Sequence, residues 1–276
     1  MTGFILANGE LSEQILYPLL GIFFLACGSC ALNQYQEQRT DGLMERTRKR
    51  PIPSGRMSPS VALFCSVLMI LTGFTFLCRP PMPSLFLGLL ALLWYNGVYT
   101  YLKRKTTFAS VPGAIIGMIP PAIGWISGGG SLSDTGLWGL SLFFFLWQVP
   151  HFWILALQHA HDYEKVGFFS LRKAFSPEQI RNMISIWLLA AGCVCFCMPL
   201  FLIIRLLPIH LLLISATLWL LYGARFDLKP DQEASLKTAF WKLNLYALWV
   251  LLLLSADSLL NSAPTTAARL VAMGWK

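Results

Sequence analysis

Three side chains that carry oxygen ligands recur every four residues near the end of the first long apolar run. Asn33, Glu37 and Asp41 occupy positions i, i+4 and i+8. A helix drifts only about 40° per step of four residues, so the three share one face. Carboxylate and amide oxygens are hard ligands, which suit Mg²⁺ held together with bound phosphates. The spacing therefore predicts a magnesium site at this helix end.

A dense basic cluster follows this acidic face, with Arg46, Arg48, Lys49 and Arg50 in one short stretch. Guanidinium groups bind phosphate oxygens in pairs and ammonium groups bind them as point charges, so the cluster could neutralise a diphosphate. The alternative is a loop that is basic only because of membrane topology, next to ordinary polar residues at a helix end. Spacing alone weighs the two equally, and the acidic face together with the cluster favours the site.

Two further apolar runs end in polar residues. Tyr99, Tyr101, Lys103 and Arg104 belong to the segment VYTYLKRKT. Aromatic and basic residues at this position are also ordinary anchors at a membrane surface. Taken alone, the segment favours that structural interpretation over a substrate site.

The fifth apolar run contains a proline and a histidine. Pro150 frees a backbone carbonyl, and His151 lies in the apolar stretch, where it should face a protein interior or a cavity. His151 either hydrogen-bonds to freed carbonyls or contacts a ligand, and both interpretations stay open. The two histidines before Asp162 are two residues apart and diverge on a helix, which disfavours a His–His–Asp metal site. Asp162 is instead predicted to be a second acidic partner of Asp41 across a cavity mouth.

The composition predicts an all-α, polytopic membrane protein. Of the 276 residues, 56% are hydrophobic and 12% are charged, and the mean hydropathy is +0.60. A soluble domain would carry about twice that charged fraction. Apolar runs of spanning length recur along the whole chain, which predicts a single domain over residues 1–276. The predicted spans are 15–32, 58–78, 84–101, 109–127, 136–157, 183–204, 206–222 and 240–260.

The basic residues are distributed unevenly among the loops between these spans. All but four of the 21 lysines and arginines fall in the loops after the first, third, fifth and seventh spans. Such loops are cytoplasmic by the positive-inside rule. The net charge of +8 therefore reflects topology, and we expect no nucleic-acid partner. The four exceptions are Arg79, Arg205, Arg269 and Lys276.

Five segments of the chain form longer motifs: DGLMERTRKRPIPSGRMSP (41–59), YTYLKRKT (99–106), GMIPPAIGW (117–125), WQVPHFWILAL (147–157) and DYEKVG (162–167). Together they resemble the UbiA family of intramembrane prenyltransferases, and within it the branch that farnesylates haem B. The resemblance implies a helical bundle around a central cavity, with two acidic motifs at its cytoplasmic mouth that bind farnesyl diphosphate through Mg²⁺.

The resemblance also implies roles for individual residues. The first acidic motif and the core of the second would bind the metal, basic residues would hold the diphosphate, and His151 would contact the tetrapyrrole. The predicted metal ligands are Asn33, Glu37, Asp41 and Asp162, and the predicted catalytic residues are Asp41, Asp162 and Lys103. The predicted substrate-binding residues are Asn33, Arg46, Arg50, Tyr101, Arg104, His151 and Lys165.

The chain departs from the family pattern at several positions. Glu37 stands where an aspartate is usual, Gln38 where an arginine is usual, and His161 where an acidic residue commonly precedes the Asp-Tyr pair. Members usually begin with an additional span, and the segment 1–7 looks like the tail of that helix. We therefore expect the first family helix to be missing here.

Three functions are compatible with these patterns. The first is transfer of the farnesyl group of farnesyl diphosphate to a vinyl group of haem B, giving haem O. The second is prenylation of another acceptor, such as a quinone or chlorin precursor, and the third is a non-catalytic haem-handling role. The first function predicts that the protein is a multi-pass protein of a bacterial-type cytoplasmic (inner) membrane, with the active-site loops on the cytoplasmic side. Whether a haem A synthase or terminal oxidase docks on it stays open.

Overall fold

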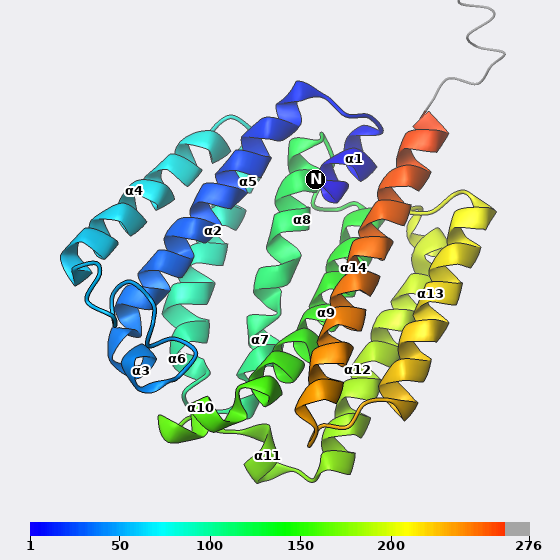
Figure 1. Ribbon diagram of the computed structural model, residues 1–276. Coiled ribbons are helices and arrows are strands. Elements are labelled where there is room, and N and C mark those ends of the chain that lie inside the picture. The colour runs from blue at the N-terminus through cyan, green and yellow to red at the C-terminus, as the bar shows by residue number, and fades with distance from the viewer. Residues whose placement is uncertain (263–276) are drawn as a thin grey trace, which may run out of the picture.

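The structure is a computed structural model that describes residues 1–262, and these residues form a bundle of helices (Figure 1). No strand occurs within that part of the chain. The residues Arg269 and Lys276, counted above by their charge, lie outside it. The helices are α1 (Thr2–Asn8), η1 (Glu13–Ile15), α2 (Leu16–Gln36), α3 (Gln38–Leu43), α4 (Pro59–Leu77), α5 (Met82–Leu92), η2 (Leu93–Tyr99), α6 (Thr100–Leu102), η3 (Thr107–Ala109), α7 (Ser110–Gly113), α8 (Ile115–Ser127), α9 (Thr135–Gln158), α10 (Ala160–Lys165), α11 (Leu171–Ala174), α12 (Pro177–Cys197), η4 (Met198–Phe201), α13 (Leu207–Phe226) and α14 (Glu233–Ser262).

The prediction of an all-α protein with eight spans is confirmed. Eight helical segments among the described residues are long and apolar enough to cross a membrane, and each overlaps one predicted span. The largest differences are at the sixth, which begins at Pro177, and the eighth, which covers Glu233–Ser262. Both extend into polar sequence, where Ser176 caps the sixth helix through a capping box.

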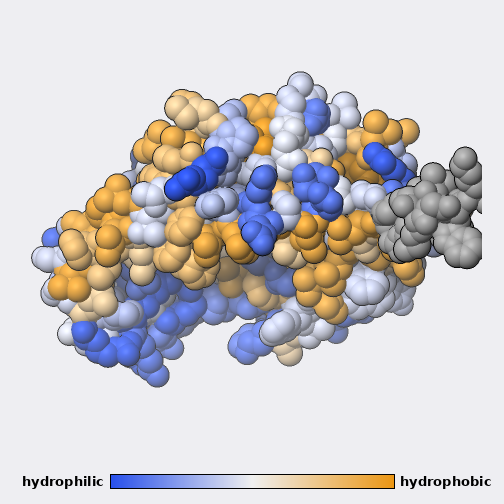
Figure 2. Space-filling model, turned by 90° about the horizontal axis from the view of Figure 1, so that it is seen from above, coloured by the Kyte–Doolittle hydropathy of each residue, from blue (hydrophilic) through white to orange (hydrophobic). Residues whose placement is uncertain are grey.

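The short connecting helices gather at one end of the bundle. Figure 1 shows α3, α10 and α11 at this end, and α1 at the opposite one. Seen from the α1 end in Figure 2, the molecule is hollowed on one side between two lobes. The basic loops predicted to be cytoplasmic thus lie on one side of the bundle, and residues from three of them line the site described below.

The N-terminal segment forms a short helix of its own. Helix α1 packs against α8 and α14, with Phe4 and Ile5 fully buried. The hydroxyl of Ser258 donates to the carbonyl of Ile5 at 3.0 Å. The segment that resembles the tail of a longer helix is therefore an integral part of the bundle.

Helices α2 and α4 pack closely because small residues face each other. A Cβ at Gly28 would lie 2.8 Å from the backbone nitrogen of Ile70 and 2.9 Å from the carbonyl oxygen of Ser66. The Ser66 hydroxyl donates to the Gly28 carbonyl at 3.1 Å. Small residues allow such close approach between helices in a membrane. This contact sets the position of α2, and therefore of the acidic face at its end.

Replacing Gly28 with alanine should destabilise the protein, because the added methyl group meets backbone atoms that cannot move aside. We expect a loss of about 1–3 kcal/mol, the usual effect of overpacking. Gly97 is the matched control, since a Cβ there would have no atom within 4 Å. Thermal unfolding of the two variants in detergent measures the difference. An equal change in the midpoint for Gly28→Ala and Gly97→Ala would contradict this account of the contact.

The third span changes its helical form before it reaches the site. Residues Leu93–Tyr99 form a π-helix, a form that is rare and often found at functional sites. Asn96 projects from it toward α2, where it donates to the Ser29 carbonyl at 3.0 Å and to the Gln36 side-chain oxygen at 3.1 Å. The Gln36 amide returns a hydrogen bond to the Asn96 carbonyl at 3.1 Å. These bonds fix the third span against the last turns of α2.

Candidate active site

A cavity of about 230 Å³ opens at the end of the bundle where the connecting helices gather. It lies between the end of α2, the loop after α3, the end of the third span, and the end of α9 with α10. All three oxygen-bearing residues of the predicted acidic face line it, and so do three of the predicted basic residues (Arg46, Arg50 and Lys103). The structure therefore brings together most of the residues that the sequence selected.

The acidic face is buried against the cavity wall. Asn33, Glu37 and Asp41 are 6%, 4% and 1% exposed. The Asn33 amide donates to the Thr100 hydroxyl at 3.0 Å, which leaves its carbonyl oxygen available to a ligand. Helix α2 ends at Gln36, and Asp41 lies in the next helix, α3. The predicted continuous helix is thus interrupted, but the three groups still line one cavity.

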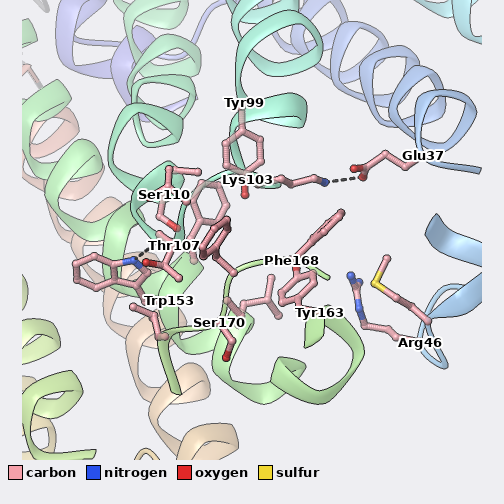
Figure 3. A pocket seen from close by; sticks show the side chains of 18 of the residues that line it. Glu37, Arg46, Tyr99, Lys103, Thr107, Ser110, Trp153, Tyr163, Phe168 and Ser170 are labelled. Atoms are coloured by element: carbon pink, nitrogen blue, oxygen red, sulfur yellow. Dashed lines mark hydrogen bonds and ion pairs between the residues drawn. The ribbon is translucent and has the colours of Figure 1, made fainter. Parts of the chain in front are cut away.

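Each of the two carboxylates of the acidic face has a basic partner. Arg50 binds Asp41 with 2.7 Å between Nη1 and Oδ2. Lys103 forms an ion pair with Glu37 (Figure 3). Arg104 also approaches Glu37, at 3.5 Å. A buried charge is costly unless it is paired, and these ion pairs meet that requirement for both carboxylates. The cavity wall therefore holds opposite charges side by side before any ligand binds.

Aromatic rings form the deeper wall of the cavity. Tyr99 stacks on Phe152 with 5.5 Å between ring centroids, and Tyr163 stacks on Phe168 at 6.0 Å. Figure 3 shows Tyr99, Tyr163 and Phe168 between the charged groups on one side and Trp153 on the other. The Trp153 indole donates to the carbonyl of Thr107 at 3.3 Å. A ligand here would have a charged end at Glu37 and Lys103 and an apolar part against the rings.

Asp162 is placed differently from the other predicted ligands. Its carboxylate is 7% exposed and accepts the backbone N–H groups of Glu45 and Arg46, at 3.0 and 3.1 Å. Burial alone would raise the pKa of Asp162, but the two amides and the charge of Lys165 bring that pKa below its ordinary value. The ionised Asp162 carboxylate therefore stabilises the folded protein at a pH above the ordinary pKa of aspartate. This stabilisation is lost as the pH falls through the lowered pKa.

Four of the other predicted substrate-binding residues lie away from the cavity lining. Tyr101 is 49% exposed, and the guanidinium of Arg104 lies over its ring, with 5.5 Å between the Arg104 Cζ atom and the ring centroid. Lys165 forms an ion pair with Glu45 at 2.7 Å. His151 packs between Trp147 and Phe240, with 4.8 and 4.9 Å between centroids. The Nδ1 atom of His151 is buried without a hydrogen-bond partner, so the structure does not place it on the carbonyls freed by Pro150.

Several residues of the cavity were not selected from the sequence. Tyr99 faces the cavity and Tyr101 does not, because residues two apart on a helix point to different sides. Tyr163 was inside a recognised segment, but nothing in its spacing distinguished it. Thr107, Ser110 and Ser170 line the cavity from short helices whose positions depend on tertiary contacts. Local patterns carry no signal for such residues.

The fold and this site define a polytopic helical membrane protein with a buried, charge-lined cavity at one end of its bundle. The model of the UbiA prenyltransferase family matches residues 1–262. The chain belongs to the UbiA prenyltransferase family, and the resemblance inferred from its motifs is confirmed.

Relatives with assigned names support this placement. The chain is 48% identical over 150 residues to a protoheme IX farnesyltransferase of Geobacter sulfurreducens. The matched region covers 54% of this chain and 55% of that protein. The chain thus spans about half the length of that relative. It is 30% identical over 265 residues to a protoheme IX farnesyltransferase of Oleidesulfovibrio alaskensis, covering 96% and 92%.

A solved structure shares the fold. A UbiA homologue from Archaeoglobus fulgidus, bound to GPP and Mg²⁺, superposes with a TM-score of 0.64 at 17% identity, covering 92% of each chain. At this identity the likeness shows the architecture alone. It confirms the predicted bundle.

Proposed function

We propose that this protein transfers the farnesyl group of farnesyl diphosphate to a vinyl group of haem B and so produces haem O. The observation that carries the proposal is the cavity in which buried Glu37 and Asp41 lie beside Lys103 and Arg50, with aromatic rings behind them. The relatives named protoheme IX farnesyltransferase support the choice of donor and acceptor.

The donor set suits Mg²⁺. Among residues 1–262, no three His, Cys, Asp or Glu side chains come together as a complete metal site. This agrees with Mg²⁺, which uses one or two carboxylates and completes its coordination with substrate phosphates and water. Asn33, Glu37 and Asp41 would hold it. When bound, Mg²⁺ supplies positive charge that stabilises the departing diphosphate. The Archaeoglobus structure with GPP and Mg²⁺ supports the same pairing.

The basic residues have a second role once a diphosphate enters. Lys103 and Arg50 are bound to carboxylates in this structure. A diphosphate between them offers new anionic partners, and the carboxylates are then free to meet the metal. Arg46, at the mouth, adds a guanidinium that fits phosphate oxygens. Fixed positive groups in a poorly hydrated site stabilise the leaving charge strongly.

The aromatic wall protects the electron-deficient carbon that remains. When the bond between C1 and the diphosphate oxygen breaks, the electron pair leaves with the diphosphate, and the allylic cation must be kept from water. Tyr99, Phe152 and Phe168 provide that apolar surface. The vinyl group of haem B then gives its electron pair to C1. Water adds to the resulting cation and loses a proton, which gives the hydroxyethylfarnesyl group.

The size of the cavity limits what it can hold. Its volume of about 230 Å³ is below the roughly 300–1,000 Å³ of pockets that enclose a drug-sized ligand. It accommodates the diphosphate end and the first isoprene units. The tetrapyrrole would therefore approach from the bilayer side of the cavity, with the rest of the farnesyl chain. His151 lies on α9 one residue before Phe152 of the wall, and we propose it as a haem contact.

The function predicts multi-pass insertion in a bacterial-type inner membrane, with the cavity on the cytoplasmic side, where prenyl diphosphates are soluble. The charge asymmetry of the loops supports this orientation. A haem A synthase or a terminal oxidase would use the product. Docking of either one on this protein stays a prediction.

Product analysis tests the function. Membranes that contain the protein, incubated with farnesyl diphosphate, Mg²⁺ and haem B, should produce haem O, identified by mass spectrometry. Prenylation of a quinone precursor in place of haem would contradict the proposed acceptor. Haem binding with no consumption of farnesyl diphosphate would indicate a non-catalytic role.

Removal of divalent metal provides a separate prediction. Treatment with EDTA should reduce product formation by roughly 100-fold or more, since the carboxylates alone repel the diphosphate. Added Mg²⁺ should restore it. Full activity in EDTA would contradict the assignment of Asn33, Glu37 and Asp41 as metal ligands.

A further inference from the structure

The carboxylate of Asp162 holds two consecutive backbone amides of a distant loop. Its Oδ1 accepts from the N–H of Glu45 at 3.0 Å and its Oδ2 accepts from the N–H of Arg46 at 3.1 Å. The ion pair between Lys165 and Glu45 adds a second link between α10 and the same loop. We call this arrangement of Asp162 with the amides of Glu45 and Arg46 the loop clamp.

The chain uses the same arrangement at the other end of the bundle. Asp257 is 1% exposed and accepts the N–H groups of Arg205 and Leu206, at 3.0 and 2.8 Å. These two residues form the turn between η4 and α13. That turn is far along the chain from every residue of the cavity. The geometry thus serves to fix a turn where no diphosphate binds.

The loop that the clamp holds contributes residues to the cavity lining. Met44 and Arg46, on either side of Glu45, lie on the cavity wall. Thr47, which is 1% exposed, donates its hydroxyl to the carbonyl of Asp41 at 2.9 Å, so the same short loop also contacts a predicted metal ligand. Asp162 itself does not belong to the lining. Its position affects the cavity through the loop that it holds.

We infer that Asp162 is a positioning residue, which fixes the Arg46 guanidinium at the cavity mouth by holding the backbone of residues 45–46. This inference rests on the proposed function for the role of Arg46 as a diphosphate contact. It replaces the expectation that Asp162 acts as a metal ligand. Hydrogen bonds from amides to an ionised carboxylate are among the stronger ones in proteins, which makes the clamp a stable feature.

Hydrogen exchange of the wild-type protein tests the clamp without any reaction. In EDTA, the amides of Glu45 and Arg46 should exchange at least about tenfold more slowly than an open chain, because each is bound to a buried acceptor. Adding Mg²⁺ with inorganic pyrophosphate should leave this protection unchanged or increase it. Exchange at the open-chain rate in EDTA would overturn the clamp. Loss of protection on adding Mg²⁺ and pyrophosphate would also overturn it, since Asp162 would then have moved to the metal.

An isosteric variant separates positioning from metal binding. Asp162→Asn keeps one acceptor oxygen but loses the other, so trypsin should cut the loop at Arg46 to Arg56 about tenfold faster in EDTA. Its KM for farnesyl diphosphate should rise about tenfold at saturating Mg²⁺, with kcat and the Mg²⁺ concentration for half activity within about threefold. A metal ligand would instead raise that Mg²⁺ concentration and leave apo proteolysis unchanged, and this result would overturn the inference.

Asp227→Asn is the matched control. Asp227 is an exposed carboxylate at the same end of the bundle, paired with Lys242 at 3.0 Å and outside the cavity. It should change neither proteolysis of the loop nor KM. If Asp162→Asn does not fold, the exchange experiment on the wild type still decides. Protected amides in a protein that forms no haem O would support the clamp and contradict the proposed function.

Discussion

Replacing Asp41 with asparagine is expected to reduce formation of haem O by roughly a thousandfold, while the protein remains in the membrane. Asp41 is 1% exposed and is one of two buried carboxylates on the cavity wall. Asparagine has the same shape but no charge, so it cannot attract the metal that the diphosphate requires. The expected defect is therefore in chemistry and metal affinity, and not in folding.

The pairing of Asp41 explains why this variant should fold. Its partner Arg50 has a side chain that is 30% exposed. When the carboxylate is neutralised, that guanidinium can reach water, and the protein avoids an uncompensated buried charge. The reverse variant, Arg50→Gln, leaves Asp41 buried and unpaired and should be the less stable of the two. Thermal unfolding in detergent compares them.

A control variant makes the activity result specific. Asp231→Asn removes an exposed carboxylate from the loop before α14, away from the cavity. It should retain full activity in the same membranes. Immunoblotting of the membrane fraction measures the amount of each protein, and mass spectrometry measures haem O. Equal product from Asp41→Asn and wild type would contradict the metal assignment.

The sequence was sufficient for the architecture because spans and topology are local properties. Length and apolarity predict each span, and loop charges predict which ends lie together. The acidic face could also be predicted from the sequence, because helical periodicity relates Asn33, Glu37 and Asp41. The break after Gln36 did not disturb this prediction, because α3 begins again at Gln38 and Asp41 still lines the cavity.

The remaining features depend on contacts between distant residues. The π-helix over Leu93–Tyr99 is held by Asn96 bonding to α2, more than 50 residues away along the chain. The clamp joins Asp162 to the amides of residues 45–46. Every residue except proline carries the same backbone amide, so the sequence could select Asp162 as a candidate but could not predict which amides it binds.

The second large effect is expected for Lys103→Met, which should lower kcat/KM for farnesyl diphosphate by roughly 100-fold. Lys103 lies at the end of the third span, where it lines the cavity and forms an ion pair with Glu37. Methionine keeps most of the length and apolar stem of lysine, so the loss is mainly the charge. Lys105→Met is the matched control, because Lys105 is exposed and lies outside the cavity lining. It should behave as wild type.

Lys103 could act on the diphosphate or could serve only to neutralise Glu37, and a double variant separates the two. Lys103→Met leaves the buried Glu37 carboxylate with Arg104, at 3.5 Å, as its remaining basic partner, so the free energy of unfolding should fall by about 1–3 kcal/mol. Adding Glu37→Gln removes the uncompensated charge and should restore the unfolding midpoint. It should not restore activity, because the diphosphate still lacks the cation of residue 103 and the metal now also lacks the Glu37 carboxylate. Recovery of both stability and kcat/KM in the double variant would show that Lys103 only balances Glu37, and would contradict both its direct role in holding the diphosphate and the assignment of Glu37 as a metal ligand.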